Sequence, residues 1–278
     1  MRLTMPKVKV TQVIDGNTFI VNNTQTVHLP ALYIPSPNAT EAGIYRQAAK
    51  KFLEDTILNR NIAIYQVRDQ ERGQFNALGH IEGYAVREDG LFIQEEMIAQ
   101  GMAFAYPSQT HFETADKLYK AEENARANRL GLWSDDQWAI KTDQQAKLMK
   151  EDKFAIVEGV IKQVASRNNV IYLNFERDWR KDFTISIDSQ KRRDFSKYGY
   201  NLMQMNGQAV RVRGWMRDYN GPMIEIFHPS QLELLEKITV QPDETVEKNT
   251  DNDNQSDEDR IQPLSPMFDN PTLQSSTQ

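Results

Sequence analysis

The sequence predicts a mainly β protein with helices, built from two small β-barrels and a disordered acidic tail. Three observations predict this class. Short stretches of alternating apolar and polar residues are separated by turn residues such as Asp15-Gly16-Asn17 and Asn220-Gly221. Each half of the chain has a helix-like stretch between its third and fourth strand-like stretches, and the end of the chain is acidic and poor in large apolar residues. We therefore expect domains at 6–137 and 153–237, a helical linker at 138–152 and a disordered tail at 238–278.

The first domain begins with strands that lead into a long helix. Val8 to Ile14 alternates as a strand does, and Thr18 to Val21 resumes the strand after the Asp-Gly-Asn turn. Between residues 40 and 60 the apolar residues recur at helical spacing, which predicts a helix. The other predicted elements are strands at 27–29, 61–67 and 79–86 and helices at 92–100 and 112–129. Five strands with a helix after the third fit a Greek-key barrel of the OB type with added helices.

The second domain is richer in strands and has the same order of elements. Strands are predicted at 154–164, 170–175, 183–187, 209–215 and 223–227, with a helix at 193–205. Five strands with one helical insertion again indicate an OB-type barrel. The polar stretch between the domains has only scattered apolar residues, which suggests a connecting helix with little apolar face.

Charge is unevenly distributed along the 278 residues, whose net charge is −6. Residues 238–278 contain nine acids and two bases, so they account for −7 and leave +1 for residues 1–237. Because the acidic surplus belongs to the tail, the net charge does not exclude a nucleic-acid partner.

The composition excludes several classes of protein. Hydrophobic residues make up 39% of the chain, which is enough for a packed core. The absence of cysteine excludes disulfides, thiolate metal sites and a cysteine nucleophile. No apolar run approaches the roughly 18 residues that a membrane span needs, and no apolar signal segment precedes the first strand. We expect a cytoplasmic protein with no membrane segment, or a periplasmic or secreted one if the true start lies upstream.

Several segments of the first domain resemble the thermonuclease, or staphylococcal nuclease-like, family. They are Val13 to Phe19, Val27 to Leu29, Gly101 to Tyr106, Ala121 to Arg126 and Gly131 to Trp133. Their order and spacing are similar to those of the family across about residues 8–135. The resemblance implies an OB barrel, nucleic-acid phosphodiesterase activity and the use of calcium. The second domain more weakly resembles the extra barrel that follows the nuclease domain in some bacterial members.

The residues that would carry the family's chemistry are replaced. The family motif Asp-Gly-Asp-Thr reads Asp15-Gly16-Asn17-Thr18 here, so Asn17 stands where the resemblance implies a metal ligand. His28 replaces a phosphate-contacting arginine. Tyr33 and Ser36 replace the second metal ligand and the water-activating carboxylate of an Asp-x-Pro-Glu pattern. By spacing, Asn76 stands where the resemblance implies a second arginine.

These replacements predict a domain that does not cleave nucleic acid. Metal-assisted cleavage of a phosphodiester needs hard oxygen ligands, a base for the attacking water and cations for the charge on phosphorus. Losing one stabilising donor of this kind costs about 10²–10³ in rate. Asp15 alone is an insufficient cage for calcium and also fits a hairpin turn, and His28 also fits a structural histidine at the edge of the core. We expect no catalytic residue, no metal and no cofactor, calcium being implied only if the family's activity were retained.

The second domain carries a candidate nucleic-acid surface. In Val210 to Trp215, alternation puts the valines on one face and Arg211, Arg213 and Trp215 on the other. Tyr172 takes the outward side of its strand, and Trp179 and Arg180 lie in the following loop. Basic side chains among aromatic ones are typical of single-strand binding on OB barrels. The same residues also fit an ordinary surface or an interface with the first domain.

Three functions fit these observations. The first is a catalytically inactive thermonuclease-like protein that binds single-stranded nucleic acid or a protein, and we favour it. The second is a divergent phosphodiesterase, which the resemblance supports and the replaced carboxylates oppose. The third is a scaffolding protein, because a body charge of +1 is a small basic excess for a nucleic-acid binder. No motif indicates the oligomeric state.

Overall fold

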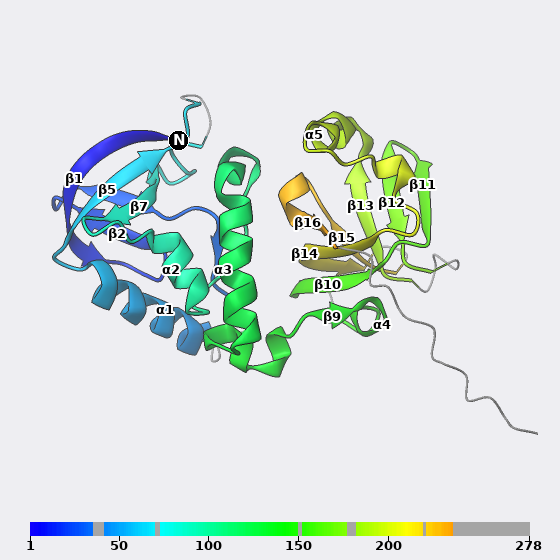
Figure 1. Cartoon of the computed structure of the whole chain (residues 1–278), viewed down its shortest axis with the longest axis horizontal. Helices are drawn as coiled ribbons and strands as arrows, with labels where there is room; N and C mark the ends of the chain where they lie inside the picture. The colour runs from blue at the N-terminus through cyan, green and yellow to red at the C-terminus, as the bar shows by residue number, and fades with distance from the viewer. Residues whose placement is uncertain (36–41, 70–72, 150–151, 177–181, 219–220, 236–278) are drawn as a thin grey trace, which may run out of the picture. The chain divides into compact units, whose positions relative to one another are not determined.

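A computed structural model describes residues 1–35, 42–69, 73–149, 152–176, 182–218 and 221–235 (Figure 1). Met1–Ile238 forms one compact unit. The fold class predicted from the sequence is confirmed, because two sheet systems form the body and helices accompany them. The predicted tail lies outside the described residues, as do the candidate residues Ser36, Trp179 and Arg180.

The first sheet has its two edges joined by a single segment of chain. Its strand order is β6-β3-β2-β1-β5-β7, and only Gly83 separates the edge strands β6 and β7. The sheet must therefore curl round toward a barrel. A Cβ atom at Gly83 would lie 2.5 Å from Ile64 Cγ2, so the crossing needs glycine. The strands are β1 Arg2–Val13, β2 Thr18–Val21, β3 Gln25–His28, β5 Asn61–Gln66, β6 Ile81–Glu82 and β7 Tyr84–Arg87.

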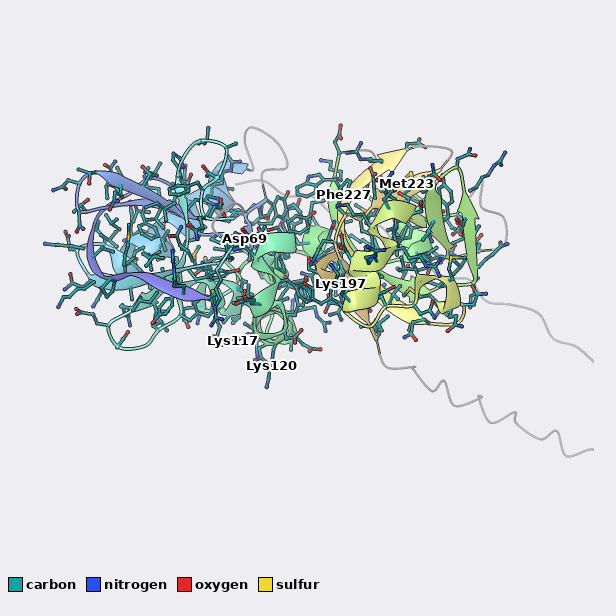
Figure 2. All side chains as sticks on the ribbon, turned by 90° about the horizontal axis from the view of Figure 1, so that it is seen from above. Asp69, Lys117, Lys120, Lys197, Met223 and Phe227 are labelled. Carbon is teal, nitrogen blue, oxygen red and sulfur yellow. The ribbon has the colours of Figure 1, made fainter. Side chains whose placement is uncertain are left out.

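Three helices contribute to the core of this first sheet. Helix α1 contributes Ala49, Leu53 and Ile57, which are fully buried and lie at helical spacing. Helix α3 buries Leu118 and Ala121, whereas its Lys117 and Lys120 project outward (Figure 2). The helices are α1 Ala42–Ile57, α2 Ile93–Ala99 and α3 Ala115–Ala127, with the 3₁₀ turns η1 Gln109–Thr114, η2 Gly131–Ser134 and η3 Asp136–Trp138 and the strand pair β4 Leu32–Tyr33 and β8 Phe104–Ala105.

The second sheet has the order β11-β12-β13-β15-β14-β10-β9, and β16 also pairs with β14. Only Ile161 and Lys162 separate β10 from β11 at the far edge, so this sheet also curls. Its strands are β9 Lys141–Thr142, β10 Phe154–Val160, β11 Gln163–Arg167, β12 Val170–Asn174, β13 Thr184–Asp188, β14 Ala209–Asp218, β15 Pro222–Glu225 and β16 Leu232–Leu234. The helical pieces are α4 Asp143–Ala146, α5 Arg192–Lys197, η4 Ser189–Lys191, η5 Leu202–Gln204 and η6 Pro229–Gln231.

Several elements differ from the sequence prediction, and one of them is the strand predicted at 79–86, which Gly83 divides into β6 and β7. The linker is not one helix, because Lys141 and Thr142 pair with β10 as a parallel strand and the Thr142 side chain then caps a single helical turn. The strand predicted at 154–164 is divided, since the amides of Ile161 and Lys162 bond to Gln208 and Asn174 on different segments. The helix predicted at 193–205 ends at Lys197, two residues before Gly199 with its φ of +84°.

None of the helices in the described ranges is long and apolar enough to cross a membrane.

His228 couples the stability of this fold to pH. Its side chain is buried against Phe112 and Tyr198, with ring centroids 5.1 and 5.6 Å away, and its Nδ1 accepts from the Ser230 amide at 3.2 Å. Burial lowers the pKa of His228 to about 4. An unfolded histidine titrates near about 6.5, so the unfolded chain binds more protons than the folded one between those values. The contribution to stability is therefore complete above about pH 6.5 and is lost as the pH falls toward 4.

We expect the free energy of unfolding to fall by at most about 3 kcal/mol between pH 7 and pH 4 through this group. His228→Asn keeps an acceptor for the Ser230 amide but cannot be protonated, so its stability should depend less on pH. Urea unfolding of both proteins across this range measures the difference, with His80→Asn as the control at a partly exposed histidine. Parallel pH profiles for wild type and His228→Asn would contradict the expectation.

Candidate functional site

The turn between β1 and β2 uses the one acidic side chain that the sequence retains from the family motif. The backbone amide of Asn17 donates to Asp15 Oδ1 at 3.0 Å, so the carboxylate of Asp15 accepts a hydrogen bond within its own turn. A Cβ atom at Gly16 would lie 2.7 Å from Ala49 Cβ, so the turn lies directly on helix α1. The interpretation of Asp15 as a hairpin-turn residue is thus confirmed.

His28 lies at the centre of a chain of polar side chains next to this turn. Strand pairing places it opposite Thr18 on β2 and opposite Glu82 on β6. Thr18 Oγ1 donates to Asn17 Oδ1 at 3.3 Å, and Asn17 Nδ2 lies 3.1 Å from His28 Nε2. The side-chain amide nitrogen of Asn17 can only donate, so it donates to Nε2. The ring proton of His28 is then on Nδ1. That atom lies 2.9 Å from Glu82 Oε1.

The second oxygen of Glu82 reaches a second histidine. Glu82 Oε2 lies 3.5 Å from His111 Nε2 in η1. Burial lowers the pKa of His111, with Glu82 opposing that shift, so this ring is neutral at neutral pH. We call His28, Glu82 and His111 the histidine–glutamate cluster. Because Nε2 of His28 accepts from the side-chain amide of Asn17, that nitrogen is not free to accept a proton from a water molecule.

The residues present do not fit a calcium ion. Calcium takes six to eight oxygen ligands, several of them carboxylate oxygens. The histidine–glutamate cluster offers one carboxylate and two imidazoles, and the described residues include no group of three or more acidic or histidine side chains placed to hold a metal ion. The polar side chains here orient one another instead.

Two other pocket positions expected from the sequence, Tyr33 and Asn76, do not join this cluster. Tyr33 belongs to a group of aromatic rings, with its centroid 4.2 Å from that of Phe154 and 5.2 Å from that of Trp215. Asn76 closes a turn, because its Oδ1 accepts from the amides of Leu78 and His80 at 3.0 Å each. Of the described pocket positions, the structure thus brings together Asp15, Asn17 and His28.

The nucleic-acid surface expected on β14 requires a correction. Alternation is right for the valines, because Val210 and Val212 are fully buried in the second core. Arg213, however, is only 1% exposed. Its guanidinium lies 2.8 Å from Glu122 on α3 and 2.5 Å from Glu233 on β16, and it donates to Ala105 O at 2.7 Å. The outward face of β14 packs on α3 at this point, so Arg213 is not available to a nucleic acid.

Arg211 and Tyr172 are not parts of one exposed basic surface either. Arg211 is mostly buried and lies 2.6 Å from Glu158 and 3.4 Å from Glu233. Tyr172 is partly exposed on β12, from which β13 and β15 separate β14 in the sheet. Trp215 remains 39% exposed. The alternative interpretation of β14, an interface with the first domain, describes Arg213 correctly.

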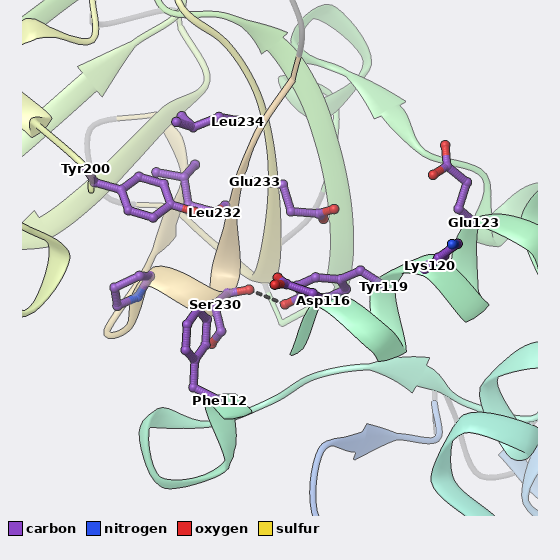
Figure 3. A pocket seen from close by; sticks show the side chains of 11 residues that line it. Phe112, Asp116, Tyr119, Lys120, Glu123, Tyr200, Ser230, Leu232, Glu233 and Leu234 are labelled. Carbon is purple, nitrogen blue, oxygen red and sulfur yellow. Dashed lines mark hydrogen bonds between the residues drawn. The ribbon is translucent and has the colours of Figure 1, made fainter. Parts of the chain in front are cut away.

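A hollow of about 370 Å³ lies beside this contact, between α3 and β16 (Figure 3). Two of its lining residues are bonded to each other, since the Tyr119 hydroxyl donates to the Ser230 carbonyl. Its charged lining consists of Asp116, Glu123, Glu233 and Lys120. This excess of carboxylates repels phosphate, so the hollow does not suit a nucleic acid.

Sequence reasoning missed Glu82, His111, Glu122 and Glu233. A signal existed for Glu122, which shares the buried face of α3 with Leu118 and Ala125. A carboxylate on an apolar face needs a cationic partner. His111 gave no such signal, because it lies in the short η1 segment with no periodic pattern.

Residues 26–135 match the model of the protein family described as "Staphylococcal nuclease homologue". An uncharacterized endonuclease of Haemophilus influenzae is 29% identical over 130 residues, which cover 46% of this chain and 66% of the relative. A micrococcal nuclease of Shigella flexneri is 29% identical over 133 residues, covering 46% of this chain and 73% of the relative. A probable endonuclease of Phaeosphaeria nodorum is 26% identical over 127 residues, covering 43% of this chain and 42% of the relative.

Proposed function

We propose, from the premise that residues 26–135 form a domain of the thermonuclease-like family, that this protein binds nucleic acid without cleaving it. One observation carries the proposal. Polar side chains at the family's catalytic positions are hydrogen-bonded to their own neighbours, since Asp15 accepts from the Asn17 amide and Asn17 bonds to His28. The contact with Asn17 leaves Nε2 of His28 unavailable as a base, and Asp15 belongs to no group of three or more acidic or histidine side chains that could hold a metal ion in the described residues.

The chemistry of phosphodiester cleavage supports the non-catalytic half of this proposal. The attacking water needs a base, and the charge growing on phosphorus needs a metal ion or arginines. Asn17 and Tyr33 are neutral where carboxylates would hold the metal. With fewer carboxylates, the same region also repels a phosphate backbone less. The names of the relatives, two endonucleases and a micrococcal nuclease, support nucleic acid as the ligand class.

A nuclease assay tests the proposal directly. We expect no cleavage of single-stranded DNA or RNA by the purified protein in calcium, magnesium, manganese or zinc. His28→Ala, purified in the same way, serves as the matched control, and a thermonuclease with an intact Asp-Gly-Asp-Thr motif as the positive control. Any trace cleavage should be equal in wild type and variant, which identifies a contaminant.

The opposite result would support the divergent phosphodiesterase. Cleavage by the wild type that falls at least tenfold in His28→Ala or Asn17→Ala would assign the activity to this chain and overturn the proposal. Such an enzyme would use the histidine–glutamate cluster as its acid and base, since His28 Nδ1 faces Glu82.

A further inference from the structure

We propose that Trp215, Tyr33 and Tyr106 form a platform on which the bases of a single-stranded nucleic acid stack, with Arg46 and Arg217 binding its phosphates. This inference rests on the proposed function and assigns the ligand to a site other than the histidine–glutamate cluster. Of the surface expected from the sequence, the platform includes Trp215. Its cations are Arg46 and Arg217 instead of Arg211 and Arg213.

The platform is a group of aromatic rings that remains partly open to solvent. The centroid of Trp215 lies 5.2 Å from that of Tyr33, 5.3 Å from that of Tyr106 and 5.3 Å from that of Phe154. These contacts are edge-on, with interplanar angles of 73°, 87° and 71°. Despite them Trp215 is 39% exposed, and Tyr33 and Tyr106 are partly exposed. Exposed aromatic surface of this kind is what stacking on bases requires.

Paired strands hold these rings in place. Trp215 on β14 stands directly opposite Phe154 on β10. Tyr33 on β4 pairs with Phe104 on β8, and the Tyr106 amide donates to Ala31 O at 2.9 Å. The Tyr106 hydroxyl accepts from Gln231 Nε2 at 3.1 Å. Because backbone pairing already orders the rings, a ligand would lose little of its binding energy in ordering them.

Two arginines at this surface supply positive charge. Arg217 lies two residues beyond Trp215 on β14, on the same face of the strand, and is exposed. Arg46 on α1 is also exposed. Arg46 follows Tyr45, which packs against the same aromatic cluster as Tyr33 and Tyr106, and the charge of Arg46 opposes the rise that burial causes in the pKa of the Tyr33 hydroxyl. Neither arginine forms an ion pair with another residue in the described ranges.

Charge complementarity decides between a nucleic acid and other occupants. Arg211 is ion-paired with Glu158, and Arg213 is ion-paired with Glu122 and Glu233. Arg217, on the same strand face as the exposed Trp215, and the exposed Arg46 on α1 are cations without an ion pair in the described residues. Basic side chains interleaved with aromatic ones match the chemistry of a single strand. The acidic hollow beside α3 has the opposite sign.

The test is a fluorescence anisotropy titration of the full chain with a labelled oligothymidine at 50 mM and 200 mM salt. We expect Trp215→Ala to weaken binding about tenfold, because a stacked base loses its aromatic partner. Trp215→Phe should retain most of the affinity, since it keeps a ring. Arg217→Gln should reduce the salt slope by about 0.7, the value for one phosphate contact on a single strand.

Tyr172→Ala and Arg193→Gln are the matched controls, because both change exposed or partly exposed residues away from the platform. We expect them to bind as the wild type does. If Trp215→Ala binds like the wild type, or if Tyr172→Ala is the weaker variant, the platform is wrong. Absence of any strand binding at 50 mM salt would also overturn it, in favour of a protein partner. If Trp215→Ala does not fold, the salt slope of Arg217→Gln tests the platform, because Arg217 is exposed and its replacement should not affect folding. Cleavage of the probe would instead contradict the proposed function and leave the platform standing.

Discussion

Replacing Arg213 with alanine is expected to lower the free energy of unfolding by about 3–5 kcal/mol, the usual cost of breaking a buried ion pair from one side. The guanidinium and Glu122 are 1% and 5% exposed, so their charges are compensated almost entirely by each other and by Glu233. The variant leaves the buried Glu122 carboxylate without its cationic partner, whereas Glu233 keeps Arg211 at 3.4 Å. It also removes the bond to Ala105 O and the stacking of Arg213 over the Tyr119 ring at 4.2 Å.

Urea unfolding followed by tryptophan fluorescence measures this effect. Arg129→Ala is the matched control, because Arg129 and its partner Asp136 are 65% and 87% exposed, and an exposed pair contributes at most about 1 kcal/mol. A triple variant with Arg213→Met, Glu122→Leu and Glu233→Gln should recover much of the loss, since no charge is then left buried alone. A loss below 1 kcal/mol in Arg213→Ala would show that water reaches the site.

Gly131→Ala is expected to be the second strongly destabilising change, by about 3 kcal/mol or more. Gly131 has φ +51°, which an L side chain adopts at a cost of about 1–2 kcal/mol. An added Cβ atom would also lie 2.3 Å from Gly101 O, which accepts the Leu132 amide at 2.8 Å. The backbone after α3 would have to move away from the backbone after α2, and Leu132 and Trp133 would move with it.

Gly90→Ala separates the two causes of this effect. Gly90 has φ +88°, but a Cβ atom there meets nothing within 4 Å. It should therefore cost only the conformational part, about 1–2 kcal/mol. Urea unfolding of the two variants under the same conditions gives the difference. Equal losses would mean that the close approach of Gly101 and Gly131 contributes nothing.

Local patterns predicted most of the fold. The helical spacing of Ala49, Leu53 and Ile57 predicted α1, and the alternation of Val210 and Val212 predicted which face of β14 is buried. Patterns did not predict β4, β8, β9 or β16, which have only two or three residues each. Such pairs form because other elements bring the segments together, and a stretch of two residues has no measurable periodicity.

The sequence predicts which groups of the nuclease motif are replaced at the candidate site, but it does not predict the contacts of the residues that stand there. Asn17 and His28, compared with the motif that the sequence resembles, predict which groups are replaced. That His28 bonds to Asn17 and faces Glu82 depends on the pairing of β3 with β2 and β6. His111 is 83 positions from His28 in sequence, and only the fold brings both to Glu82.

The sequence by itself determined the β-rich class, the alternation of β14 and the location of the acidic surplus in residues 238–278, and it predicts that the carboxylates of the nuclease motif are replaced. Only the tertiary structure decided what each exposed face meets. Arg213 and Trp215 share one face of one strand, yet one is 1% and the other 39% exposed. Alternation assigns a side chain to a face because it depends on backbone geometry alone. Burial of that face depends on which other element packs there, and here α3 covers Arg213 and leaves Trp215 partly open.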